Sequence, residues 1–184
     1  MTHDGRTTHT ASHPIQFRSA RPTDGASLWH LIQATGTLEL NSAYFYVLFA
    51  TDFGRTCLVA EHDGEMIGAV IGYHPPQQAR TAFVWQVGLR PEWRGRGLGV
   101  TLLERWIDLP ANRDRYWVTA TVADDNAASQ ALFHRFAERG GTECTVQPHF
   151  TADQFPVDHP SEPLYRIGPL HRAVMRSRPA ELSA

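Results

Sequence analysis

Residues 83–99 read Phe83-Val84-Trp85-Gln86-Val87-Gly88-Leu89-Arg90-Pro91-Glu92-Trp93-Arg94-Gly95-Arg96-Gly97-Leu98-Gly99, an apolar strand followed by a turn rich in glycine and arginine. An apolar run with helical spacing continues to Ile107, and Pro110 marks its end. Glycines between a strand and a helix leave backbone N–H groups unpaired, and the helix dipole favours an anion beside them. The segment therefore predicts a phosphate-binding turn.

The spacing of this turn excludes two common phosphate-binding motifs. A Walker loop needs a lysine followed by Ser or Thr, and the chain contains no lysine. The dinucleotide fingerprint needs a third glycine three residues after its second, whereas Gly95, Gly97 and Gly99 alternate. The remaining alternative is a glycine-rich turn that only caps a core helix.

Length and composition indicate one soluble domain. The chain has 184 residues, 42% of them apolar, and a formal net charge of −2, which disfavours a nucleic-acid partner. No apolar run approaches the ~20 residues that span a membrane. Two cysteines, Cys57 and Cys144, suit a reducing cytoplasm. We expect a loose tail over 1–14, a folded domain over 15–170 and a mobile end over 171–184.

Hydrophobic periodicity predicts a mixed α/β chain. The expected strands are 15–18, 56–61, 66–73, 83–89, 116–122, 142–147 and 164–167. The expected helices are 26–33, a run around 44–49 capped by Asn41 or Ser42, 98–107, and a helix that Asn126 opens and Gly140-Gly141 ends. A long irregular loop is expected over 148–163.

This element order and the turn together resemble the GCN5-related N-acetyltransferases. Their Arg/Gln-x-x-Gly-x-Gly/Ala segment corresponds to Arg94, Gly97 and Gly99. The resemblance covers roughly 17–169 and implies a mixed, mostly antiparallel seven-stranded sheet flanked by helices, splayed between its fourth and fifth strands. It also implies acetyl-CoA as co-substrate, no metal, and cofactor contacts from the strand end and the turn: Val87, Gly88, Leu89, Arg94, Gly95, Arg96, Gly97, Leu98, Gly99 and Val100.

Residues 126–133 resemble the second cofactor segment of that family. The resemblance implies that Asn126 bonds the pantetheine arm and that Ser129 and Phe133 also line it; Asn126 alternatively serves only as a helix cap. Many relatives have a tyrosine where this chain has Phe133, which cannot donate a proton to the leaving thiolate. A water, Tyr44 or Tyr165 is left for that step.

Four segments, 38–46, 83–87, 121–133 and 162–169, resemble more closely the L-2,4-diaminobutyrate acetyltransferases of ectoine biosynthesis. The resemblance implies acetylation of the side-chain N4 amine of L-2,4-diaminobutyrate by direct attack on the thioester. Two departures stand out. Glu39 replaces a more common Asp, and His159 is followed by Pro160 rather than Glu, which leaves Glu162 as the nearest carboxylate.

The proposed substrate is a cation that must lose a proton before it attacks. With a lysine-like pKa of about 10.4, keeping the amine neutral near pH 7 costs roughly 4 to 5 kcal/mol. Carboxylates both bind and deprotonate such amines. We expect Glu39, Tyr44 and Glu162 to be catalytic, with substrate contacts also from Asn41, Ser42 and Trp85; a solvated Glu39 and a core Trp85 are the alternatives.

Two other functions stay open: acetylation of another small amine, such as a polyamine or an aminoglycoside, and binding of acyl-CoA without catalysis. The α-carboxylate of the substrate has no assigned partner, with Arg55 and Arg166 as candidates. Relatives of this type commonly form homodimers, so we expect a homodimer here.

Overall fold

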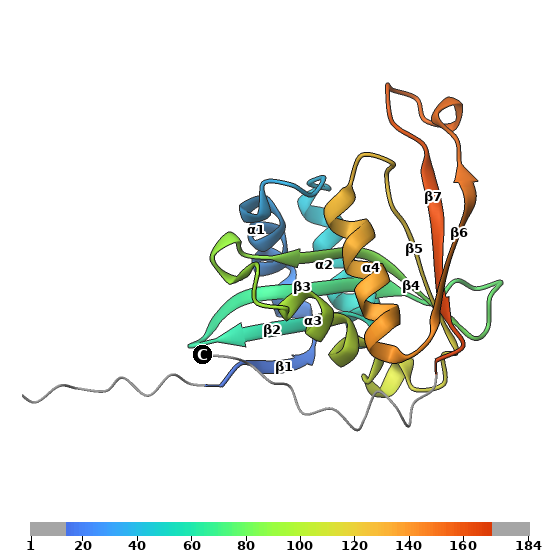
Figure 1. Ribbon diagram of the computed structural model, residues 1–184. Helices are drawn as coiled ribbons and strands as arrows, with labels where there is room; N and C mark the ends of the chain where they lie inside the picture. The colour runs from blue at the N-terminus through green and yellow to red at the C-terminus, as the bar shows by residue number, and fades with distance from the viewer. Residues whose placement is uncertain (1–13, 171–184) are drawn as a thin grey trace, which may run out of the picture.

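The computed structural model describes residues 14–170, and the expected end segments lie outside them except for Pro14. Seven strands form one sheet with helices on both faces (Figure 1). The strands are β1 (Gln16–Ser19), β2 (Leu58–His62), β3 (Glu65–Tyr73), β4 (Thr81–Leu89), β5 (Trp117–Thr121), β6 (Glu143–Phe150) and β7 (Glu162–Gly168). The helices are α1 (Gly25–Thr35), α2 (Ala43–Asp52), α3 (Leu98–Ile107) and α4 (Ala127–Gly140), with 3-10 turns η1 (Pro22–Asp24), η2 (Gly54–Thr56), η3 (Pro91–Trp93), η4 (Pro110–Asn112) and η5 (Ala152–Gln154). The expected strands and helices are confirmed in type and order, while the expected late loop differs.

The sheet has the order β1-β2-β3-β4-β5-β7-β6, and β4–β5 is its parallel pair. That pair is short, because it joins only Thr81–Phe83 to Trp117–Thr119. β4 continues to Leu89, and among residues 14–170 no strand pairs with this end on the β5 side. The sheet therefore splays between its fourth and fifth strands, as predicted.

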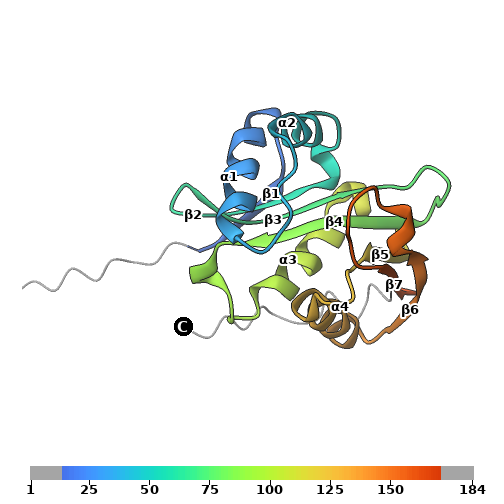
Figure 2. The same cartoon turned by 90° about the horizontal axis from the view of Figure 1, so that it is seen from above.

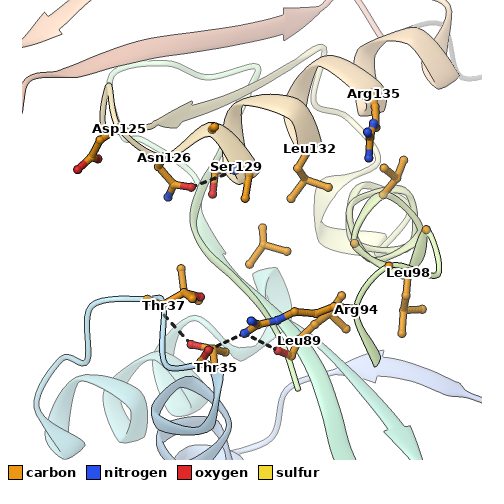
Figure 3. Close-up of a pocket in the computed structure, with 18 residues that line it drawn as sticks. Thr35, Thr37, Leu89, Arg94, Leu98, Asp125, Asn126, Ser129, Leu132 and Arg135 are labelled. Atoms are coloured by element: carbon orange, nitrogen blue, oxygen red, sulfur yellow. Dashed lines mark hydrogen bonds between the residues drawn. The ribbon is translucent and has the colours of Figure 1, made fainter. Parts of the chain in front are cut away.

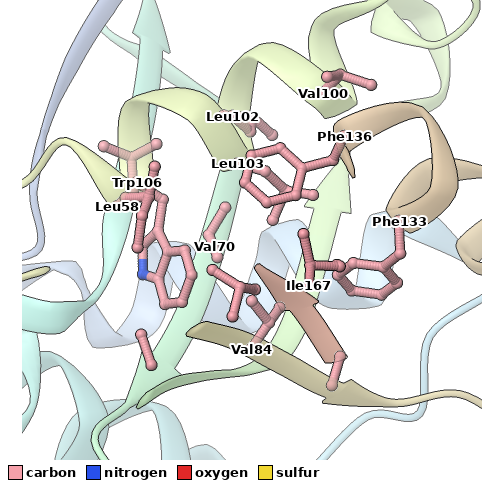
Figure 4. Close-up of a cluster of buried hydrophobic side chains, with 14 of the residues drawn as sticks. Leu58, Val70, Val84, Val100, Leu102, Leu103, Trp106, Phe133, Phe136 and Ile167 are labelled. Atoms are coloured by element: carbon pink, nitrogen blue, oxygen red, sulfur yellow. The ribbon is translucent and has the colours of Figure 1, made fainter. Parts of the chain in front are cut away.

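The helices form two layers. α1 and α2 cover one face, while α3 and α4 cover the other (Figure 2). Beneath α3 and α4, a cluster of buried apolar side chains includes Trp106, Phe136 and Val84 (Figure 4). A second cluster, with Leu28 and Ile71, packs beneath α1 and α2. Each helix layer is thus held to the sheet by apolar packing, and the splay lies between the two halves.

The late loop is shorter than predicted. β6 extends to Phe150 and β7 begins at Glu162, with Phe150 paired to Glu162. Pro148 suggested a strand end, but β6 is an edge strand and its register shifts between Gln147 and Phe150. A proline is tolerated at such a bulge because its missing N–H leaves no ladder bond unmade. Glu162 therefore stands on a strand rather than in a loop.

An ion cluster joins β1, β2 and the start of α1. The Arg18 guanidinium donates to Asp24 Oδ2 at 2.6 Å and also to Glu61. Asp24 is 7% exposed and accepts a further bond from the Arg21 N–H at 2.7 Å. Burial alone would raise the pKa of Asp24, but the bonds from Arg18 and Arg21 hold it below its ordinary value of 3.8.

No helix of residues 14–170 is both long and apolar enough to span a lipid bilayer.

Candidate active site

A cleft of about 730 Å³ lies between the ends of β4, α1, α3 and α4 (Figure 3). Asn126 and Ser129 on α4 face Thr35, Thr37 and Arg94 across the opening. The lining residues are Thr35, Thr37, Leu38, Val87, Leu89, Arg94, Gly95, Gly97, Leu98, Gly99, Val100, Asp125, Asn126, Ala127, Ala128, Ser129, Leu132 and Arg135. Below we call it the α3–α4 cleft.

The turn from Gly95 to Val100, which we call the amide turn, carries the strongest chemical signal in this cleft. Among residues 14–170, no protein group accepts a hydrogen bond from its backbone N–H groups; the first helical bond of α3 runs from Thr101 N to Gly97 O. Gly95 and Gly97 have φ of +75° and +74°, a conformation that side chains with a Cβ rarely adopt. A row of free amides at a helix N-terminus is an anion-binding site.

Gly99 has a different role from the other two glycines. A Cβ placed there would lie 3.1 Å from Leu132 Cδ1 on α4. Its lack of a side chain therefore lets the two helices that wall the cleft approach each other.

Three residues expected at the cofactor lie outside the lining. The Gly88 position faces Ile32 of α1, where a Cβ would come within 2.8 Å of Cδ1. The Arg96 guanidinium stacks over the Trp93 ring at 5.4 Å, so only its backbone belongs to the amide turn. Phe133 is 4% exposed and packs in the core beneath α4 (Figure 4). The family resemblance implied cofactor contacts for these residues, whereas strand alternation at Gly88, the stacking of Arg96 on Trp93 and core packing of Phe133 keep their side-chain positions out of the lining.

A β-bulge sets which groups of β4 face the cleft. Ile71 pairs with Gln86 and Gly72 with Val84, so Trp85 is the extra residue. Further along, the Arg90 N–H donates to Ile67 O of β3 at 2.9 Å. Because successive N–H groups point in opposite directions along a strand, those of Val87 and Leu89 point toward the open side of the sheet. Of Val87, Gly88 and Leu89, the three residues of this strand expected at the cofactor, Val87 and Leu89 therefore point their N–H groups away from β3.

The Arg94 side chain, just before the amide turn, hydrogen-bonds to the ends of α1 and β4. Its guanidinium donates to Thr35 O at 2.6 Å and to Leu89 O at 3.4 Å. These carbonyls end α1 and β4, so the side chain joins three elements at the rim of the cleft. Sequence reasoning assigned it to the cofactor and did not find this link.

Residues of α4 form the opposite wall. Asn126 caps the helix, with its Oδ1 accepting from Ser129 N at 3.1 Å, and its side chain also lines the cleft. Arg135 points from α4 toward α3 and was missed from the sequence (Figure 3). A signal existed, because Ala128, Leu132 and Arg135 have the i, i+4, i+7 spacing of one helix face.

The residues expected at the substrate lie in two parts of the fold, one near the start of α2 and one at the start of β7. None of them lines the α3–α4 cleft. Glu39 is exposed between α1 and α2, and Asn41 and Ser42 follow it; Ser42 caps α2 by accepting from Phe45 N at 3.3 Å. Tyr44 lies on α2 and is 73% exposed. Trp85 is 47% exposed, with its ring centroid 5.6 Å from that of Phe45.

Glu162 belongs to a small polar cluster on the other side of the splay. Its Oε2 accepts from the Thr121 hydroxyl at 2.6 Å, and its Oε1 lies 3.7 Å from His159 Nε2. Although Pro160 follows His159 directly, the i, i+3 spacing places the His159 imidazole beside Glu162. Trp85 and Thr121 both stand two residues beyond the last β4–β5 pair, Phe83 with Thr119, so they flank the splay from opposite strands. Among the described residues, no contact joins Glu39 to Glu162.

A model of the acetyltransferase (GNAT) family matches residues 26–137. This chain belongs to that family. An L-2,4-diaminobutyric acid acetyltransferase of Nocardia farcinica is 40% identical over 158 residues, 86% of this chain and 82% of the relative. One of Streptomyces coelicolor is 41% identical over 160 residues, 85% of this chain and 94% of the relative.

This acetyltransferase is similar in structure to a relative that was solved with bound ligands. Diaminobutyrate acetyltransferase EctA from Paenibacillus lautus, solved in complex with its substrate L-2,4-diaminobutyric acid and coenzyme A, superposes with a TM-score of 0.81. It is 34% identical, and the match covers 86% of this chain and 96% of that one. Ard1 from Thermoplasma volcanium, at 18% identity and a TM-score of 0.64, shares the fold.

The cysteines of this acetyltransferase are poor nucleophiles. Burial raises the pKa of Cys57 to about 11, and it also raises the pKa of Cys144. A thiol that keeps its proton does not attack a thioester readily. This chemistry fits direct transfer to an amine better than an acyl-enzyme.

Proposed function

We propose that this acetyltransferase moves the acetyl group of acetyl-CoA to the N4 amine of L-2,4-diaminobutyrate, a step of ectoine biosynthesis. The observation that carries the proposal is the likeness to EctA, which was solved with that substrate and coenzyme A. The relatives of Nocardia farcinica and Streptomyces coelicolor support the same substrate. We assign the activity to the domain over 15–170.

The α3–α4 cleft holds the coenzyme in this proposal. The amide turn, Gly95–Val100, donates to the diphosphate, because its N–H groups have no acceptor among residues 14–170. The pantetheine arm then runs between the β4 end and the start of α4, contacting Val87, Leu89, Asn126 and Ser129. Arg135 adds a guanidinium to the same cleft, and it interacts with the coenzyme phosphates.

The acceptor pocket, which we define as Glu39, Trp85, His159 and Glu162, lies where the splayed strands separate. Its carboxylates bind the ammonium groups of the substrate and take a proton from N4 directly or through water. The hydrogen bond from the Thr121 hydroxyl to Glu162 Oε2 gives that carboxylate a fixed direction, and His159 lies beside its other oxygen. Tyr44, Asn41 and Ser42 complete the entrance from the α2 side.

The reaction forms an N–C bond and breaks a C–S bond. The neutral N4 amine attacks the thioester carbonyl carbon, and the N–H groups of Val87 and Leu89 stabilise the resulting oxyanion. Collapse releases the coenzyme thiolate, while the amine proton passes to a pocket carboxylate. We assign the proton for the thiolate to Tyr165 rather than Tyr44, because the Tyr165 ring centroid lies 6.2 Å from that of Phe133, the position where many relatives have a tyrosine.

Release of free thiol from acetyl-CoA tests the proposal. We expect the fastest release with L-2,4-diaminobutyrate, slower release with L-ornithine and slower still with L-lysine, and a product acetylated at N4 by NMR. Equal or faster use of lysine would remove the narrow assignment. Binding of acetyl-CoA without thiol release for any diamine would leave a non-catalytic acyl-CoA-binding protein.

The same proposal includes a cytoplasmic homodimer that contributes to osmoprotection. Edge strand β6 exposes Val146 and Phe150 at 46% and 40%, which supports an interface there. Sedimentation equilibrium checks the mass, with twice the 20.6 kDa chain expected.

A further inference from the structure

Two buried polar side chains hold the backbone around Glu39. Tyr46 is 0% exposed and Gln86 is 8% exposed, both in the layer between the sheet and α2. The Tyr46 hydroxyl donates to Gln86 Oε1 at 3.2 Å and accepts from Asn41 N at 3.2 Å. Gln86 Nε2 donates to Glu39 O at 2.7 Å. The two residues therefore bond the chain on both sides of Leu40.

The sheet supplies one end of this link through its bulge. Because Trp85 is the extra residue on β4, the next side chain, Gln86, turns to the α1–α2 face opposite Ile71. Trp85 itself stays half-exposed. One local irregularity thus presents Trp85 to the acceptor pocket and connects its neighbour to the backbone of Glu39.

Packing alone does not account for a tyrosine and a glutamine at these positions. A buried hydroxyl and amide are costly unless hydrogen-bonded, and replacing both by apolar groups of the same shape is often nearly neutral for stability. Here both bonds to the main chain reach the segment Glu39–Asn41. The Glu39 side chain meanwhile remains exposed and free to meet a ligand.

We propose that Tyr46 and Gln86 are positioning residues that fix the Glu39 carboxylate relative to Trp85 and the thioester. This inference rests on the proposed function, in which Glu39 binds the substrate amine. Gln86 acts through the main chain of Glu39, to whose carbonyl oxygen it donates, rather than on the amine.

Steady-state kinetics of Tyr46→Phe and Gln86→Met test the inference. We expect each to raise KM for L-2,4-diaminobutyrate by about 10-fold, as the loss of a buried hydrogen bond allows, while KM for acetyl-CoA stays unchanged. The double variant should be no worse than the worse single one, because the bonds act as one unit. Tyr73→Phe is the matched control, since this half-buried tyrosine on β3 contacts Phe83 and not the Glu39 segment.

A cycle with Glu39→Gln separates positioning from general damage. In that background Tyr46→Phe should add no further increase in the amine KM. If it still raises KM for both substrates, the pair serves only structure and the inference fails. If the wild-type protein acetylates diaminobutyrate and neither variant changes its KM, the inference also fails while the proposed function stands; absence of wild-type thiol release overturns the proposed function instead.

Discussion

The α3–α4 cleft and the acceptor pocket are built in different ways. The cleft lies between the ends of β4, α1, α3 and α4, and the groups proposed to bind the diphosphate are backbone N–H donors of one continuous turn, Gly95–Val100. The proposed pocket draws on side chains from the α1–α2 segment, from β4 and from the segment that leads into β7; Glu39 is exposed and Trp85 is half-exposed. In the proposed function, backbone groups bind the coenzyme and side chains select the amine.

The difference predicts that variants in each region alter the kinetics of one substrate. The largest effect is expected from Gly97→Val. A β-branched residue at φ of +74° is strained by about 1 to 3 kcal/mol, so the turn relaxes and its amides leave the diphosphate. We expect kcat/KM for acetyl-CoA to fall about 100-fold.

Gly64→Val is the matched control for that substitution. Gly64 in the β2–β3 hairpin has φ of +81° and, like Gly97, open space around its Cβ position. It should lose comparable thermal stability and keep the KM for acetyl-CoA. An equal loss of coenzyme affinity in both variants would show that the loss comes from general destabilisation and not from the amide turn.

Glu162→Gln tests the acceptor side. Removing a charge that binds an ammonium group should lower kcat/KM for L-2,4-diaminobutyrate by about 30-fold, with coenzyme affinity unchanged by calorimetry. Glu143→Gln, an exposed carboxamide variant on β6, should match the wild type. A fall in coenzyme affinity as large as the fall in amine turnover would contradict the assignment of Glu162 to the amine alone.

Arg135→Gln is expected to have a smaller effect on the cleft. An exposed guanidinium contributes modestly, so KM for acetyl-CoA should rise about 5-fold, and the difference from wild type should shrink as salt is added. Arg139→Gln, one turn further along α4 and paired with Glu104 at 3.0 Å, should leave that KM unchanged. Salt-independent loss in Arg135→Gln would argue against a phosphate contact.

Asp24→Asn should change neither substrate's kinetics, because the ion cluster with Arg18 lies outside both regions. It should lower the free energy of unfolding at pH 7 by about 1 to 3 kcal/mol. The pKa of Asp24 is depressed in the folded protein, so this stabilisation is present above the ordinary value of 3.8 and is lost as the pH falls through the folded pKa. Urea unfolding at pH 7 and at successive pH values below 3.8 should show the difference between the two proteins shrinking as the acid increases; a constant difference would assign the effect to packing.

The comparison also separates what the sequence could predict from what it could not. Gly95, Gly97 and Asn126 lie in short contiguous motifs, so the glycine spacing predicted a phosphate-binding turn, and the family resemblance that these motifs carry implied the fold. The bond from Arg94 to Thr35 joins residues far apart in the sequence, so it could not be predicted from local spacing. The contact of His159 with Glu162 depends on the conformation of a loop that contains Pro160. The bulge at Trp85 has no sequence pattern that marks it within an apolar strand. The direction of the Gln86 side chain therefore could not be predicted from the sequence.

A crystal structure of the complex with coenzyme A tests the central claim most directly. The account predicts diphosphate oxygens within about 2.7 to 3.2 Å of backbone nitrogens in the Gly95–Val100 turn. A diphosphate bound elsewhere, with that turn empty, would contradict it.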